Sequence, residues 1–403
     1  MISRYYKKSD VFYGITYVLL FLFAIRFLNK NNTFLLLFAC AGIVYGTVHH
    51  SLTTSWENVV LTLYGLFYYL TKAHWLGGVD STSLITYALG APLMYIAGQQ
   101  LIRFADNREG YYKRACWTMA VGMFLFAILS YLKNGVIYNY EYGKDLRQVP
   151  DFWIGQASLW QATNINGYCV FAIVVSMVAF FQKAQGMKLI TAVVIFVGSI
   201  YLSLVTAART NLFLVILVAG CYLLFVILLK KNIRYVKRKK TLKKLVLFFA
   251  ALIVAQVVVL NLDSILYRLP LQAFTQRMSN RQLTISEDGR WTMWATVIKD
   301  IPIHPFGNIT SVRAAHNIYL DVARESGVIP MVLLFIFTAM VLTTAWKLLW
   351  NNQYSIQIRI FNAVLIFSLW ASFLIEPVMT AKPFVFIAFC MVCGMQKELN
   401  RRN

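Results

Sequence analysis

Long apolar stretches alternate with short polar segments along most of the 403-residue chain. A helix needs about 20 mostly apolar residues to cross the hydrocarbon core of a bilayer. Twelve stretches meet or approach this length, at 11–28, 33–50, 57–72, 83–102, 115–132, 165–182, 188–207, 211–229, 245–261, 327–349, 359–377 and 383–395. Two of them are short, so ten or eleven spans stay open as alternatives. We expect an all-α polytopic membrane protein of about twelve transmembrane helices, with 1–403 forming a single integral membrane domain.

Composition agrees with this pattern. Hydrophobic residues make up 59% of the chain and charged residues 13%. Soluble domains have about 45–50% apolar and about 25% charged residues. The first apolar run is followed by "RFLNKNN" rather than by a small-residue cleavage site, so we expect no cleavable signal peptide.

The net charge of +22 comes from basic residues that gather between the predicted spans. Basic segments lie at 4–8, 103–114, 230–244 and 397–403, and twelve spans place all four on one side. The positive-inside rule makes that side the cytoplasm. The segment 230–244 could also bind nucleic acid or phosphoinositides, but we favour a topogenic loop facing anionic lipids and expect no nucleic-acid partner.

The opposite, extracytoplasmic side receives a segment near 133–164, the turn "TAARTN", and a long loop over 262–326 that we expect to hold short helices. Within this loop, "RWTMWATVIKDI" places Trp291, Trp294 and Ile298 on one side of a helix. Such a pattern predicts an amphipathic helix in the membrane interface, where Trp is favoured. The aromatic stretch 138–160 suits sugar stacking or, equally, an interfacial aromatic belt.

Arg209 lies in a tight turn between two strongly apolar runs. Placing an arginine side chain within the bilayer costs free energy, so such a residue usually faces a cavity or an interaction partner. The alternative is an arginine that extends to the outer headgroups. We favour the functional interpretation because this side has few other topogenic charges.

Two further candidates lie in the long loop. Arg290 follows Glu287 and Asp288 and falls in the first turn of the predicted helix, where the helix dipole disfavours a cation. An anionic ligand nearby would offset this unfavourable interaction with the dipole. An ion pair between Arg290 and Glu287 or Asp288 would offset it equally well. His316 titrates near neutrality and can accept a proton in a transition state. His304, in a proline-punctuated turn, fits a structural role.

Cofactor motifs give no positive signal. The sequence has no HExxH motif, carboxylate cluster, P-loop or GxGxxG, so we expect neither a metal site nor a nucleotide cofactor. Cys390 and Cys393 form a CxxC inside a predicted span, which we interpret as packing rather than as a redox or metal site.

The order of these segments is familiar. "TAARTNLF" is followed by "GRWTMWATVIKDIPIHPFGN" and then by "AHNIYLDVARESGVIP". Over about residues 200–350 this series resembles the O-antigen ligase and O-antigen polymerase superfamily of bacterial membrane glycosyltransferases. The sequence departs from that family's usual PxxGxG pattern by having "PFGN", with Asn308 where a second glycine is common. This departure affects the expected conformation of the turn and not the set of candidate catalytic residues.

The resemblance implies an active site on the extracytoplasmic face of the bacterial cytoplasmic membrane. Glycan would pass from an undecaprenyl-pyrophosphate-linked donor to an acceptor sugar hydroxyl, with inversion and without metal or nucleotide sugar. The family's essential arginines match Arg209 and Arg290, and its essential histidine matches His316. Guanidinium groups suit pyrophosphate oxygens, and His316 would deprotonate or orient the attacking hydroxyl. Arg313 and Arg324 are further phosphate candidates.

Two questions stay open at this level. A ligase passes a finished chain to a lipid acceptor, whereas a polymerase passes it to another lipid-linked glycan. A flippase or transporter of lipid-linked oligosaccharide is the alternative class, and it should place functional charges in the middles of several spans. The distinctive charges of this chain gather in outer loops, which favours the enzyme.

Overall fold

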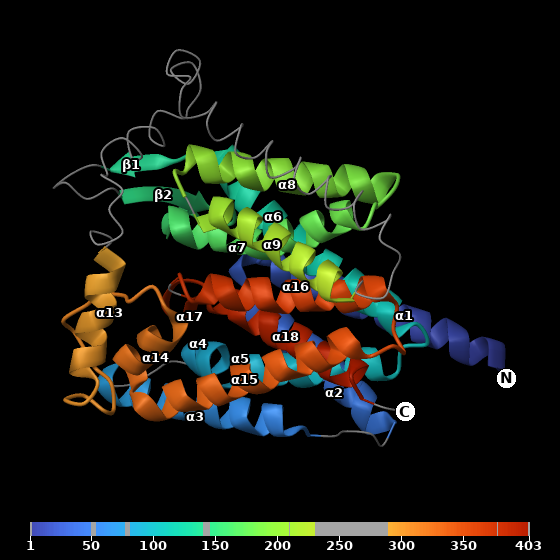
Figure 1. The fold of residues 1–403 in the computed structure, drawn as a ribbon, viewed down its shortest axis with the longest axis horizontal. Helices are drawn as coiled ribbons and strands as arrows, with labels where there is room; N and C mark the ends of the chain where they lie inside the picture. Colours follow the sequence, from blue (N-terminus) through green and yellow to red (C-terminus); the bar gives the residue numbers. More distant parts are fainter. Residues whose placement is uncertain are drawn as a thin grey trace, which may run out of the picture. The chain divides into compact units, whose positions relative to one another are not determined.

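The computed structural model describes residues 2–49, 54–76, 81–139, 146–208, 210–229, 289–376 and 378–401 (Figure 1). Seven described helices are long and apolar enough to cross a membrane: α2 (Asn31–Val48), α6 (Arg108–Asn134), α7 (Ala162–Phe181), α8 (Met187–Val205), α9 (Thr210–Leu229), α15 (Val328–Trp350) and α16 (Ile356–Phe373). The prediction of a helical, membrane-embedded protein is confirmed at this level.

Other predicted spans are helical but shorter or less apolar. They are α1 (Ile2–Ala24), whose apolar part is Val11–Ala24, α3 (Trp56–Leu76), α5 (Gly90–Arg103) and α18 (Pro383–Leu399). A π-helical stretch, η2 (Leu84–Leu89), leads into α5. The predicted span 245–261 lies outside the described residues, so the count of twelve stays a prediction.

The chain divides into two compact units. Unit 1 comprises Met1–Met123, Ile285–Asn351 and Leu369–Asn403, and unit 2 comprises Phe124–Thr284 and Asn352–Ser368. The expectation of a single membrane domain stays a prediction.

Helix α18 lies at the centre of unit 1, with almost every residue buried. It packs closely against α5 because each helix has a glycine at the crossing. A Cβ on Gly98 would lie 2.2 Å from the Met391 carbonyl oxygen, and one on Gly394 would lie 2.0 Å from that of Tyr95. Small residues of this kind let helix backbones approach without side-chain interference.

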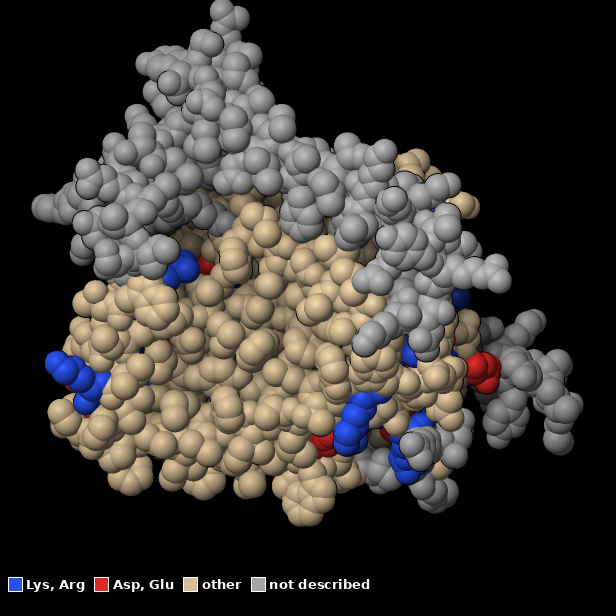
Figure 2. Space-filling model, in the orientation of Figure 1, with Lys and Arg blue, Asp and Glu red and all other residues tan. Residues whose placement is uncertain are grey.

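Helices α3 and α15 also pack together in unit 1, and each exposes one apolar face. Figure 2 shows a wide face of uncharged side chains over these two helices, with the visible charged residues near the helix ends. An apolar exposed face bounded by charge is what a lipid-facing helix pair requires.

Unit 2 contains a three-stranded antiparallel sheet in the order β1-β2-β3, which the helical pattern did not predict. Its strands are β1 (Ile137–Asn139), β2 (Leu146–Asp151) and β3 (Gly155–Gln161). Asp151 closes the β2–β3 turn, because its carboxylate accepts from the Trp153 backbone N–H at 2.7 Å and from Trp160 Nε1 at 3.0 Å. The described part of the aromatic stretch 138–160 is therefore largely sheet rather than loop. Helices α7, α8 and α9 pack against one another in the same unit.

The predicted loop 262–326 is described from residue 289 onward and holds two short helices. They are α13 (Gly289–Asp300) and α14 (Ile318–Ser326). The helix predicted over "RWTMWATVIKDI" is confirmed, and the Trp291 and Trp294 rings lie 5.0 Å apart on it. Trp294 packs with buried Val297, whereas Trp291 and Ile298 are 55% and 57% exposed.

Candidate active site

His316 has an uncommon backbone conformation, with a φ of 55°. Few residues other than glycine adopt positive φ, and such strain persists where surrounding contacts hold the backbone in place. The side chain is half-buried, with its Nδ1 atom away from solvent. The residues on either side of His316 show how this conformation is held.

Ala315, directly before His316, is fixed from two helices. Its carbonyl oxygen accepts a hydrogen bond from Trp294 Nε1 of α13 at 2.6 Å. Its N–H donates to Asp321 Oδ1 of α14 at 2.7 Å. Because these bonds reach the same peptide segment from opposite sides, α13 and α14 together set the position of the histidine backbone.

Asn317, directly after His316, caps α14. Its Oδ1 accepts from the backbone N–H of Tyr319 at 3.0 Å and of Leu320 at 3.3 Å, the usual role of asparagine at a helix start. Its Nδ2 donates to the Leu374 carbonyl oxygen at 3.3 Å. The sequence pair His-Asn thus combines a strained histidine with the cap that holds it.

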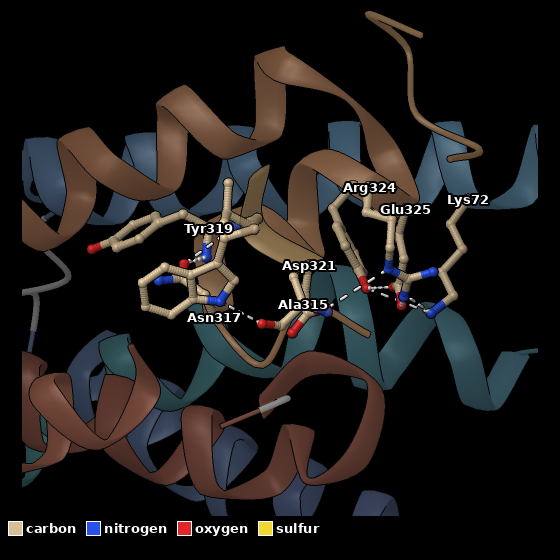
Figure 3. A network of polar contacts seen from close by, with 10 residues as sticks. Lys72, Ala315, Asn317, Tyr319, Asp321, Arg324 and Glu325 are labelled. Carbon is tan, nitrogen blue, oxygen red and sulfur yellow. Dashed lines mark hydrogen bonds and ion pairs between the residues drawn. The ribbon is translucent and has the colours of Figure 1, made fainter. Parts of the chain in front are cut away.

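Asp321, in the first turn of α14 after the Asn317 cap, is fully buried. Figure 3 shows its carboxylate directed toward Ala315. The second oxygen, Oδ2, is buried and accepts no hydrogen bond from the described residues. Burial raises the pKa of Asp321 to about 6, although the Ala315 N–H and Arg324 act in the opposite direction. The group is therefore poised to change charge just below neutrality.

A row of alternating charges continues from Asp321 along α14 to α3 (Figure 3). Arg324 Nε lies 3.7 Å from Asp321 Oδ1, and Arg324 Nη2 lies 2.6 Å from Glu325 Oε1. Lys72 Nζ lies 3.2 Å from Glu325 Oε2, which also accepts from the Tyr68 hydroxyl. Arg324 is thus engaged by two carboxylates, which leaves it less available to a phosphate group.

The turn that departs from the family pattern packs against the end of α14. A Cβ on Gly327 would lie 2.3 Å from the Pro305 carbonyl oxygen, and the Val328 N–H donates to that oxygen at 2.9 Å. Gly307 and Gly327 both have a φ of 90°, and Asn308 has a φ of 65°. Asparagine tolerates this left-handed conformation better than most residues, so Asn308 meets the demand that glycine usually meets.

Three of the four predicted site residues belong to one described segment of unit 1. Arg290 lies half-buried in the first turn of α13, one turn before Trp294 and on the same helix face. Arg313 is exposed, three residues before His316. Arg209 lies outside the described residues, as do the acids proposed to pair with Arg290, so the meeting of Arg209 with the other three stays a prediction.

The described residues flanking Arg209 form a buried polar cluster in unit 2. Asn166 Nδ2 donates to Thr206 Oγ1 at 2.8 Å, and Asn166 Oδ1 accepts from Ser203 Oγ at 2.9 Å and from Asn211 Nδ2 at 3.1 Å. Arg147, from β2, donates to the Thr206 carbonyl oxygen at 2.5 Å and to that of Ala207. These contacts hold the end of α8 and the start of α9.

A buried ion pair in the C-terminal part of the chain was missed by sequence reasoning. Lys382 Nζ lies 3.2 Å from Glu376 Oε2, and both side chains are almost fully buried. The pair lies in the break between α16 and α18, close in sequence to Leu374, which accepts from Asn317. Its signal was present in "LIEPVMTAKPF", since charges inside an apolar run mark functional sites in membrane proteins.

The described residues include no group of three or more His, Cys, Asp or Glu side chains able to hold a metal. Cys390 and Cys393 are buried thiols within α18, in agreement with the packing interpretation. Comparison with protein-family models and with curated proteins found no match.

Proposed function

We propose that this chain is a membrane glycosyltransferase of the O-antigen ligase or polymerase type. It transfers glycan from an undecaprenyl-pyrophosphate-linked donor to an acceptor sugar hydroxyl on the extracytoplasmic face of the bacterial cytoplasmic membrane. The acceptor is a glycan or a lipid-linked acceptor. The main support is the geometry of His316, whose backbone is held at positive φ by hydrogen bonds on both sides.

In the proposed reaction, the acceptor hydroxyl attacks the anomeric carbon of the donor. A new C–O bond forms as the bond to the pyrophosphate oxygen breaks, which inverts the anomeric centre. His316 takes the hydroxyl proton, and undecaprenyl pyrophosphate leaves with the bonding electron pair. The step requires neither a metal ion nor a nucleotide sugar.

Arginine is suited to the charge that develops on this leaving group. A guanidinium group stays protonated and binds phosphate oxygens through two parallel N–H bonds. Arg290 and Arg313 lie on the same segment as His316, and Arg209 is assigned to the pyrophosphate by the family resemblance alone. Fixed cations in a poorly hydrated site stabilise the negative charge that develops on the leaving group in the transition state.

The test uses purified protein in lipid nanodiscs with a polyprenyl-pyrophosphate-linked oligosaccharide, with products resolved by gel and mass. His316→Asn is the informative variant, because asparagine tolerates positive φ but has no basic nitrogen. Loss of a general base lowers transfer by about 10²–10⁴-fold. His304→Asn, at an exposed histidine of the same segment, is the matched control and should retain activity. Full activity of His316→Asn would contradict the proposal.

The same assay separates the alternatives. A ladder of longer lipid-linked glycans identifies a polymerase, whereas release of polyprenyl pyrophosphate only after addition of a lipid acceptor identifies a ligase. The buried Glu376–Lys382 pair is the one observation that favours a transporter, since transporters place charge at helix breaks. Movement of intact donor across proteoliposomes, without release of pyrophosphate lipid, would support that alternative.

A further inference from the structure

Large apolar side chains are exposed on a part of unit 1 that belongs to no candidate span. Trp291 and Ile298 of α13 are 55% and 57% exposed, and Ile303 and Phe306, in the turn after α13, are 72% and 61% exposed. Four such side chains within sixteen residues are more than scattered surface hydrophobics, and exposed apolar patches usually mark an interaction surface. We call these four residues the apolar shelf.

The shelf joins the ends of two helices that expose apolar faces. Trp75, near the end of α3, donates from Nε1 to the Phe306 carbonyl oxygen at 2.9 Å. At the start of α15, Val328 donates to the Pro305 carbonyl oxygen at 2.9 Å. The 301–306 turn is therefore attached to both helix ends at once.

The exposed faces of α3 and α15 run up to these attachment points. Along α3 the exposed apolar residues are Leu63, Leu66, Phe67, Leu70 and Trp75. Along α15 they begin with Ile329, Val332, Phe335 and Ile336. Helix α15 is a candidate membrane span, so its exposed face contacts lipid. The shelf continues this lipid-facing surface beyond the helix ends.

Helix α13 is arranged in three longitudinal stripes. Trp294 and Val297 face the small core formed with Ile309 and Ala315. Trp291 and Ile298 form the neighbouring exposed stripe, and the polar residues Thr292 and Lys299 lie beyond them. One side of α13 therefore packs on protein, and its outward side carries an apolar stripe beside a polar stripe that includes a lysine. Such a helix suits the layer between acyl chains and anionic headgroups.

We propose that the apolar shelf rests in the interfacial layer of the bilayer, with Trp291, Ile298, Ile303 and Phe306 inserted among headgroups and upper acyl chains. The occupant of this surface is lipid rather than a second protein. Because α13 also holds Ala315, this contact sets the height of His316 relative to the membrane. The proposal does not depend on the proposed glycosyl transfer.

The test places one cysteine at a time in the full-length protein, with exposed Cys40 and partly exposed Cys221 replaced by alanine. Cysteine replaces Ile298, Ile303 or, as the matched control, Thr310, an exposed polar residue of the same segment. Each variant is labelled with an environment-sensitive fluorophore and placed in nanodiscs that hold a single protomer. Quenching by nitroxides on lipid chains is compared with quenching by aqueous iodide.

We expect the labels at 298 and 303 to emit at shorter wavelength than the label at 310 and to be quenched by the lipid nitroxides but weakly by iodide. The label at 310 should show the reverse. Equal iodide quenching at all three sites would overturn the proposal, because the shelf would then face water. Protection from both quenchers at 298 and 303 would also overturn it, because protein would cover the shelf. These readings do not use transfer activity, so failure of the glycosyltransferase proposal would leave them unchanged.

Discussion

Two polar clusters show different solutions to the problem of burying polar groups. In unit 1, the cluster around α14 is made of ionisable side chains: Asp321, Arg324, Glu325 and Lys72. In unit 2, the cluster among α7, α8 and α9 centres on the neutral groups of Asn166, Ser203, Thr206 and Asn211, with Arg147 on nearby carbonyls. The first joins the short helix α14 to Lys72 of α3, two helices outside the seven candidate spans, and the second lies within and between spans.

The difference follows from the energy of burial. A hydrogen-bonded amide or hydroxyl can be buried at modest cost, whereas an ion must be paired or must change its protonation state. The neutral cluster therefore suits a permanent structural joint between helices. In the charged cluster, burial raises the pKa of Asp321 to about 6, and this residue holds the backbone next to the histidine proposed to move a proton. Four experiments test this contrast.

The largest expected effect is a pH dependence confined to the charged cluster. The pKa of Asp321 in the folded protein, about 6, exceeds the usual value near 4, so folding is favoured by the protonated form. This contribution is complete below pH about 4 and is lost as pH rises through about 6. Relative to Asp321→Asn, wild-type stability should fall by at most about 3 kcal/mol across this window.

Thermal unfolding in detergent micelles at pH 4 to 8 measures this difference. Use of Asp321→Asn as the reference cancels the titration of other groups, because asparagine keeps the oxygen that accepts from Ala315. Parallel curves for the two proteins would show that Asp321 does not titrate as proposed.

The neutral cluster should show a similar loss of stability but no pH dependence. Asn166→Leu keeps the side-chain volume and removes the bonds to Ser203, Thr206 and Asn211, at an expected cost of about 2–3 kcal/mol. The loss in melting temperature should be the same at pH 5 and pH 8. Ser176→Ala, which removes a bond within the same helix, should cost under about 1 kcal/mol. A pH-dependent loss in Asn166→Leu would remove the contrast.

A smaller effect should separate two substitutions of Asp321 at pH 8. Asp321→Ala leaves the buried Ala315 N–H without its acceptor and should be less stable than Asp321→Asn by about 1–2 kcal/mol. If Asp321 positions His316, only the alanine variant should also lose glycan transfer in nanodiscs. Equal transfer by both variants would show that the Ala315 bond does not position the histidine.

The smallest effect concerns the turn at Asn308, where φ is 65°. Asn308→Gly should match or exceed wild-type stability, because glycine adopts positive φ without strain. Asn308→Ala should lose about 1 kcal/mol, since alanine has a Cβ but lacks the short polar side chain that lets asparagine tolerate the left-handed region. Unfolding temperatures of the pair measure the difference, and identical values would argue that this turn carries no strain.

The local pattern of apolar and polar residues was sufficient to predict many of the helices. Runs of apolar residues predicted the helices, because a span must satisfy its own backbone hydrogen bonds and present apolar side chains to lipid. The helix over Gly289–Asp300 and the histidine before the Asn317 cap were also readable, since spacing and capping are properties of neighbouring residues.

Contacts between distant segments were not readable in the same way. Lys72 meets Glu325 across 253 positions of the chain, and Asn317 meets the Leu374 carbonyl across 57. The sheet in unit 2 was hidden because aromatic and polar residues there suit a loop, a strand or a membrane belt equally well. Asp321 was not singled out from the sequence, because its burial depends on packing between helices. Periodicity reports which side of a helix is apolar, but the charge state of a buried group depends on which neighbours the folded chain brings to it.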